Sequence, residues 1–353
     1  MRYELNAPLQ GVDWFVSDAS WARIRPQNRR QDNDSAWQRT RYCPPRFFLA
    51  QARTKGVHFS GSRLDCGAMF APVATKDPTA VEVEVQSAYL QMFPGGDRLF
   101  VPRVFGWVIE SFLGNYADYQ AIDARYHDLE HTMQGTLCMA RLLRGRHAAG
   151  AEPVLSQRMF ELGLLAILLH DTGYLKRRGD TKGTGAKYTI THVTRSAEFA
   201  SRILKEKGLK DSEIKSVQNM IRCTGVDAAL DMIPFGSDEE RVVGFALGTA
   251  DLLGQMAAED YVEKLPVLFS EFAEAAEYSH DQASLVAMFS SAEDLMRKTP
   301  MFWENYVKPK LDDEFLMLHE FLRDPHPNGE NEYEDRIEEN MERLRGRLAT
   351  ASR

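Results

Sequence analysis

The sequence predicts a mainly α-helical protein, in which a helical bundle follows a smaller N-terminal region of mixed or irregular structure. From about Val104 onward, apolar residues recur with a period near 3.6, in segments separated by short Gly, Pro or Asp breaks. Before residue 100, Pro, Gly, Asn and Asp are frequent and helical periodicity is poor. The composition, 44% hydrophobic and 27% charged, is that of an ordinary globular protein.

These patterns divide the chain into an N-terminal region 1–103, a helical domain 104–325 and a charged C-terminal helix within 326–353. The sequence does not indicate what residues 1–103 do. Within them, Val81-Glu-Val-Glu-Val85 alternates as a half-buried strand would. Further on, helices are expected over 104–120, 128–146, 156–170, 191–207, 211–223, 238–258, 260–278, 281–297, 310–322 and 331–348.

The last of these helices carries one apolar stripe, formed by Ile337, Met341, Leu344 and Leu348. The stripe predicts that the helix packs on the body of the protein. A seam between the two chains of a homodimer is the alternative.

Bulk properties exclude several classes of protein. No stretch approaches the roughly 18 apolar residues that a membrane span needs, and the N-terminus lacks a signal-peptide pattern, so we expect a cytoplasmic protein with no membrane partner. The net charge of -8 argues against bulk nucleic-acid binding. The cysteines form no CxxC pair, which predicts reduced, mostly buried thiols: Cys43, Cys66, Cys138 and Cys223.

Histidine placement carries the functional signal. Leu162-Gly-Leu-Leu-Ala-Ile-Leu-Leu-His-Asp171 is an almost wholly apolar helix that ends in two groups that are costly to bury. A divalent cation would offset that cost, because His170 offers an imidazole nitrogen and Asp171 a carboxylate able to bridge two metal ions. A helix that ends at the surface with a polar pair is the alternative.

A second motif, Tyr126-His-Asp-Leu-Glu-His131, places two histidines four residues apart. If the helix has begun by then, both lie on one face and can point into one cleft. We interpret His131 as a metal ligand and His127 as a general acid for a leaving alkoxide, because imidazole titrates near neutral pH.

The third motif is Thr249-Ala-Asp251, in an apolar helix interrupted by that one carboxylate. A lone buried acid needs a partner, and a metal ion would supply it. Gln255 follows one turn later on the same face, where it lines the pocket or faces solvent.

The order His…His-Asp…Asp in helical contexts resembles the HD superfamily of metal-dependent phosphohydrolases. Tyr126-His-x-x-x-His131 with Thr249-Ala-Asp-Leu252 is similar to the catalytic domain of class I cyclic-nucleotide phosphodiesterases, over roughly residues 105–310. The resemblance implies an HD-domain helical bundle whose first metal is held by His131, His170, Asp171 and Asp251. It also implies that Asp171 bridges to a second metal and that His127 matches the acid.

Two positions depart from that family pattern. Asp128 stands where the family has Asn after its leading His. The glutamine that reads a purine is not evident before an aromatic residue near the end of the domain, where the nearest stretch is Thr299-Pro-Met-Phe-Trp-Glu-Asn-Tyr306. There, Phe302 or Trp303 is a candidate to stack on a base, with core packing as the alternative.

A glycine-rich, basic segment follows the second motif. It contains five candidates to hold phosphate oxygens, with a solvated surface loop as the alternative for each: Lys176, Arg177, Arg178, Lys182 and Lys187. His192 opens the next helix and is a candidate ligand for the second metal, as in some HD subfamilies. A helix-capping role is its alternative.

Together these features predict a metal-dependent phosphodiesterase that hydrolyses a nucleotide-type phosphate ester, either a cyclic nucleotide or a dinucleotide, through a hydroxide bridging two divalent ions. The donor set suits Mg, Mn, Fe, Co, Ni or Zn. One alternative is a di-iron oxygenase on the HD scaffold, which would need more histidines than His192 adds. Another is a non-catalytic nucleotide-sensing HD domain, which would bind without turnover.

Overall fold

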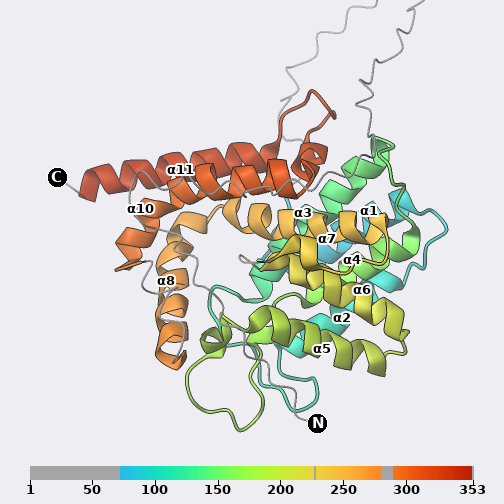
Figure 1. Ribbon diagram of the computed structural model, residues 1–353, viewed down its shortest axis with the longest axis horizontal. Helices are drawn as coiled ribbons and strands as arrows, with labels where there is room; N and C mark the ends of the chain where they lie inside the picture. The colour runs from blue at the N-terminus through green and yellow to red at the C-terminus, as the bar shows by residue number, and fades with distance from the viewer. Residues whose placement is uncertain (1–71, 226–227, 280–288, 352–353) are drawn as a thin grey trace, which may run out of the picture. The chain divides into compact units, whose positions relative to one another are not determined.

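The computed structural model describes residues 72–225, 228–279 and 289–351. These ranges contain ten α-helices and no strand, which confirms the mainly α prediction (Figure 1). The helices are α1 (Pro78–Met92), α2 (Phe100–Phe112), α3 (Leu129–Ala148), α4 (Gln157–Leu169), α5 (His192–Glu206), α6 (Asp211–Ile221), α7 (Asp238–Met256), α8 (Tyr261–Tyr278), α10 (Ala292–Phe302) and α11 (Glu332–Ala351).

Helices α3 and α7 lie together at the centre of this core (Figure 1). Two glycines allow their backbones to approach closely. A Cβ placed on Gly254 would lie 2.8 Å from the backbone carbonyl of Gln134 and 2.9 Å from the Cα of Gly135. The crossing therefore sits within one turn of His131 on α3 and of Asp251 on α7, so it fixes how close these two side chains come.

The close crossing yields a first prediction. In Gly254→Ala, the new methyl group meets backbone atoms that cannot rotate away, so α3 and α7 must move apart. We expect a loss of about 1–3 kcal/mol in the free energy of unfolding, typical of overpacking, together with weaker metal binding. Denaturant unfolding and metal titration measure the two effects.

A matched control lies on an exposed face of α11. A Cβ on Gly346 would meet no atom within 4 Å, so Gly346→Ala should be neutral or stabilising by up to about 1 kcal/mol. Equal stability of the Gly254 and Gly346 variants would contradict the tight crossing.

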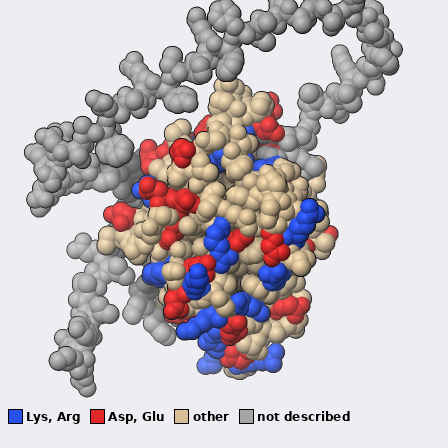
Figure 2. Space-filling model, turned by 90° about the vertical axis from the view of Figure 1, so that its right-hand side faces the viewer, with Lys and Arg blue, Asp and Glu red and all other residues tan. Residues whose placement is uncertain are grey.

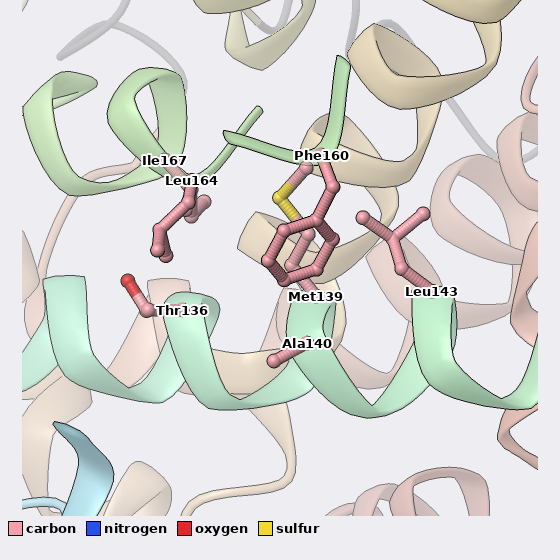
Figure 3. A pocket seen from close by; sticks show the side chains of 7 residues that line it. All are labelled: Thr136, Met139, Ala140, Leu143, Phe160, Leu164 and Ile167. Carbon is pink, nitrogen blue, oxygen red and sulfur yellow. The ribbon is translucent and has the colours of Figure 1, made fainter. Parts of the chain in front are cut away.

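Helix α4 packs along α3 on another side. Phe160, Leu164 and Ile167 of α4 point down onto Thr136, Met139, Ala140 and Leu143 of α3, around a small apolar gap (Figure 3). All seven side chains are buried. This contact fixes the C-terminal end of α4, from which the next residues enter the site.

The predicted strand at Val81–Val85 is wrong, because these residues form part of α1. Asp77 caps the helix by accepting a hydrogen bond from the Thr79 amide, and Pro78 occupies its first turn. Alternating valines fit a strand, but Val81 and Val85 also lie one helical turn apart. The helical stripe continues through Ala88, Tyr89 and Met92, all buried, whereas Val83 remains 64% exposed.

Helices α1 and α2 belong to the same hydrophobic core as α3 and α4, although most of them precede residue 104. Tyr89 of α1 donates a 2.8 Å hydrogen bond to Glu161 of α4, and its ring stacks on Phe160. The core of the helical domain therefore begins about 25 residues earlier than the change of periodicity suggests.

Two further predicted helices differ from those observed. The segment 104–120 ends as a helix at Phe112, because Gly114 turns the chain with a φ of 77°. The segment 310–322 is two short helical pieces, Lys310–Glu314 and Leu318–Leu322, separated by Leu316 and Met317 in the left-handed region. The start of the helix expected over 281–297 lies outside the described residues, and α10 begins at Ala292.

The C-terminal helix α11 packs on the body of the chain. Ile337, Met341 and Leu344 are fully buried in the common core. Asn340 donates hydrogen bonds to the backbone carbonyls of Met256, the last residue of α7, and of Ala258, two residues further on. Three of the four residues of the predicted apolar stripe are therefore buried against the same chain.

Surface and cysteine features agree with the bulk properties. No helix in the described ranges is long and apolar enough to cross a membrane. On the face shown in Figure 2, acidic and basic side chains are interspersed. Cys138 and Cys223 are buried free thiols, as predicted, while Cys43 and Cys66 lie outside the described residues.

Candidate metal centre

Four side chains that are distant in sequence meet in the interior. The Nε2 atom of His131 lies 3.2 Å from Asp171 Oδ2 and 3.2 Å from Asp251 Oδ1. The Nε2 atom of His170 lies 3.4 Å from each of the same two oxygens. His131, His170 and Asp171 are all at least 95% buried. The predicted convergence of the three motifs is therefore present.

Each of these four side chains is positioned by a distinct local feature. Asp128 caps α3 by accepting a hydrogen bond from the His131 amide, which places His131 in the first turn of that helix. The acid that departs from the family pattern thus has a structural role here. His170 is the C-cap of α4, Asp171 follows it directly, and Asp251 lies within α7.

The acids and histidines perturb each other electrostatically. Burial lowers the pKa of His131, but the close approach of the Asp171 and Asp251 carboxylates outweighs burial and raises that pKa to about 10. Burial alone would raise the pKa of Asp171, yet the neighbouring His170 and His131 hold it well below its usual range. Two carboxylates thus stay ionised in the interior, where a cation would stabilise them.

The donor atoms fit a metal ion in three respects. The buried His170 Nε2 and Asp171 Oδ2 atoms have no hydrogen-bond partner. Two donors bound to one ion at ~2.1 Å lie ~3.0 Å apart at a right angle and ~3.4 Å apart at a tetrahedral angle, which matches the four nitrogen–oxygen distances above. The three residues whose donor atoms all lie within 4.8 Å of one another are His131, His170 and Asp251. His170 Nδ1 donates to the Ile167 carbonyl at 2.7 Å, which leaves the Nε2 lone pair free.

His192 lies on the other side of Asp171. Its Nε2 is 3.9 Å from Asp171 Oδ1, whereas His131 and His170 face Oδ2. Its Nδ1 donates to the Thr189 carbonyl at 2.5 Å, and burial lowers its pKa, so the neutral form with a free Nε2 is favoured. The two oxygens of Asp171 therefore face different histidines, as a bridging carboxylate requires.

His127 precedes α3 rather than lying on it, yet its ring centroid is 5.3 Å from that of His131. Its Nδ1 lies 2.6 Å from Oε2 of Glu271, on α8. Because a carboxylate accepts a hydrogen bond, Nδ1 donates it, and Nε2 makes no part of this contact. The ring also stacks on Tyr174 at 4.5 Å, and Tyr174 in turn stacks on His192 at 4.9 Å.

Glu271 is the residue that sequence reasoning missed. Its Oε1 accepts hydrogen bonds from the backbone amides of Arg125 and Tyr126, both at 2.7 Å. Burial raises its pKa, but the contact with His127 outweighs burial and keeps the pKa below its usual value. The sequence did contain a signal for Glu271, because this acid is among the buried residues of α8, together with Leu265 and Ala275.

Four of the five cations in the basic segment already bind acidic side chains or backbone carbonyls in this structure. Lys176 pairs with Asp123 at 2.7 Å, Lys187 with Asp180 at 2.5 Å and Arg177 with Asp118 at 2.6 Å. Arg178 donates to the backbone carbonyls of Tyr119 and Gly114, and Lys182 is exposed. The sequence could not reveal these acids, because most of them lie some 50 residues earlier.

Of the two other residues predicted to bind substrate, Gln255 lies beside the candidate centre and Trp303 lies away from it. Gln255 Oε1 accepts a 2.8 Å hydrogen bond from the Tyr126 hydroxyl, next to the first motif, and its Nε2 donates to the Asp251 carbonyl. Trp303 is only 1% exposed and donates to Glu338 of α11 at 2.8 Å. Its indole therefore packs in the core and presents no open face to a ligand.

Comparison with known protein families gives a match over most of the described chain. Residues 79–323 match the family described as Npun_R2479-like. This range is more than half of the chain and contains His131, His170, Asp171, His192 and Asp251. A search among curated proteins finds none that matches.

Proposed function

The chain belongs to the Npun_R2479-like family, and we propose that it is a metal-dependent phosphohydrolase whose centre is formed by His131, His170, Asp171 and Asp251. The observation that carries this proposal is the position of Asp171. One of its oxygens faces two histidines and the other faces His192, so a single buried carboxylate can serve two divalent ions.

Each residue of the centre has its own role in the proposed reaction. Two divalent ions, when bound, would polarise the phosphoryl group and make a bound water acidic enough to attack phosphorus. His131, His170, Asp171 and Asp251 would hold the first ion, and His192 with Asp171 would serve the second. His127 carries the proton for the leaving oxygen on Nε2, while Glu271 fixes its ring through Nδ1.

We further propose a phosphodiesterase acting on a nucleotide-type ester, cyclic nucleotide or dinucleotide. The motif resemblance to cyclic-nucleotide phosphodiesterases supports this substrate class. Since four cations of the basic segment have partners in this structure, phosphate oxygens would have to exchange with Asp118, Asp123 or Asp180, or meet Lys182 alone. The polar Gln255 next to Asp251 is the other candidate contact.

The test is metal analysis of the purified protein followed by a substrate screen. We expect at least one transition-metal ion or Mg²⁺ per chain, and phosphate-ester hydrolysis that chelation abolishes and metal addition restores. The screen compares cyclic mononucleotides, cyclic dinucleotides, linear dinucleotides and nucleoside monophosphates.

Two outcomes would replace the proposal. Oxygen consumption by an iron-loaded protein without phosphate release would favour the di-iron oxygenase class. Tight nucleotide binding without turnover, at full metal occupancy, would favour a sensing domain.

A further inference from the structure

A second cluster of side chains that could hold a metal ion lies away from the three motifs, where α11 meets the segment 310–322. At its centre is His319, which is 5% exposed. Its Nε2 lies 3.4 Å from Glu334 Oε1, 3.5 Å from Asp312 Oδ1 and 3.5 Å from Glu320 Oε1. The donor atoms of His319, Glu320 and Glu334 all lie within 4.8 Å of one another.

The imidazole of His319 is poorly satisfied by hydrogen bonds. Its three carboxylate neighbours lie beyond the 2.7–3.2 Å range of good N–H···O bonds. Its buried Nδ1 has no hydrogen-bond partner at all. The other ring nitrogen, Nε2, points at the three carboxylates without a short bond to any of them, so a cation between Nε2 and the carboxylates would give each of them a partner.

The carboxylates around His319 outnumber the basic side chains that contact them. Arg323 binds Glu320 Oε2 through Nε at 2.6 Å, donates to Glu320 Oε1 at 3.2 Å and reaches Glu334 Oε2 at 3.3 Å. It uses the far oxygen of Glu334, while Oε1 faces His319. Three carboxylates thus face one arginine beside the His319 ring.

We propose that His319, Glu334 and Glu320 bind a Zn²⁺ ion at a structural site. The spacing supports this ion, because N and O donors at ~2.0–2.1 Å around a tetrahedral centre lie ~3.4 Å apart, and His319 Nε2 lies 3.4 Å from Glu334 Oε1 and 3.5 Å from Glu320 Oε1. The ion joins two separate elements, the turn Leu318–Leu322 and the first turn of α11. This site shares no residue with the proposed catalytic centre and does not depend on its function.

The test compares zinc content after equilibrium dialysis of the full-length protein against buffered Zn²⁺. Glu334→Gln keeps the side-chain size and removes one ligand charge, and His319→Ala removes the nitrogen. Each should lose one equivalent of zinc relative to the wild type. Glu342→Gln, an exposed acid on the same helix, is the matched control and should lose none.

Anomalous diffraction at the zinc edge gives a second measurement. The proposal predicts a peak ~2 Å from His319 Nε2 in the wild type and no such peak in Glu334→Gln. Asp171→Ala should lose metal from the other centre and keep this peak. Unchanged zinc content in Glu334→Gln with native circular dichroism, or no peak beside His319 in zinc-loaded crystals, would overturn the proposal even if His319→Ala fails to fold.

Discussion

Asp171→Ala is expected to abolish hydrolysis and to remove metal from the catalytic centre, while the helix content stays nearly unchanged. Asp171 is the one residue whose two oxygens face both proposed ion positions. No neighbouring side chain can replace it, because the other acid, Asp251, already faces the same pair of histidines. Activity should fall to the level of the buffer blank in the presence of any added divalent metal.

Metal content, turnover and circular dichroism are measured together on this variant. Asp231→Ala, which removes an exposed acid, is the matched control and should keep metal and activity. Asp171→Asn tests charge separately from shape, and we expect it to lose metal as well, since an amide is a weak ligand for such ions. Retained turnover in either Asp171 variant would refute the assignment of the centre.

The metal centre could be predicted from the sequence because its ligands interrupt apolar helices. His170, Asp171 and Asp251 each follow or interrupt a run of buried residues, where an ionisable group has a large energetic cost unless something binds it. Helical periodicity also places such residues on the inner face. Sequence reasoning therefore found the side chains that converge here without knowledge of their contacts.

Features that depend on contacts between distant segments were not predictable in this way. The acids that neutralise the basic segment are ordinary surface residues in the sequence, and only the fold brings Asp118 and Asp123 beside Arg177 and Lys176. Helix α1 was misassigned because Val81-Glu-Val-Glu-Val85 satisfies both a period of two and a spacing of four. Burial against α3 and α4, which the sequence does not contain locally, decides between them.

His127→Ala is expected to lower kcat by about 10²–10⁴-fold while metal content stays at the wild-type level. The reason is its position, since its ring adjoins His131 but its Nδ1 is bound by Glu271 rather than by any atom of the metal cluster. Loss of metal in this variant would instead make His127 a ligand. Metal analysis alongside the kinetics separates the two roles.

Glu271→Gln should have a smaller effect in the same direction, with kcat reduced and KM nearly unchanged. The amide can still accept from the backbone of Tyr126, but it no longer stabilises positive charge on the imidazole. A glutamate that only packed α8 in place would affect stability without this kinetic pattern. Glu277→Gln, an exposed acid on the same helix, is the control.

The dependence on the leaving group gives the strictest test of the proton transfer. An ester whose leaving group is a nitrophenolate needs little protonation, because that anion is already stable in water. On such a substrate, His127→Ala should recover most of the wild-type rate, whereas Asp171→Ala should remain inactive. An equal loss on nitrophenyl and alkyl esters would contradict the acid role of His127, because a proton donor matters most where the departing oxygen is most basic.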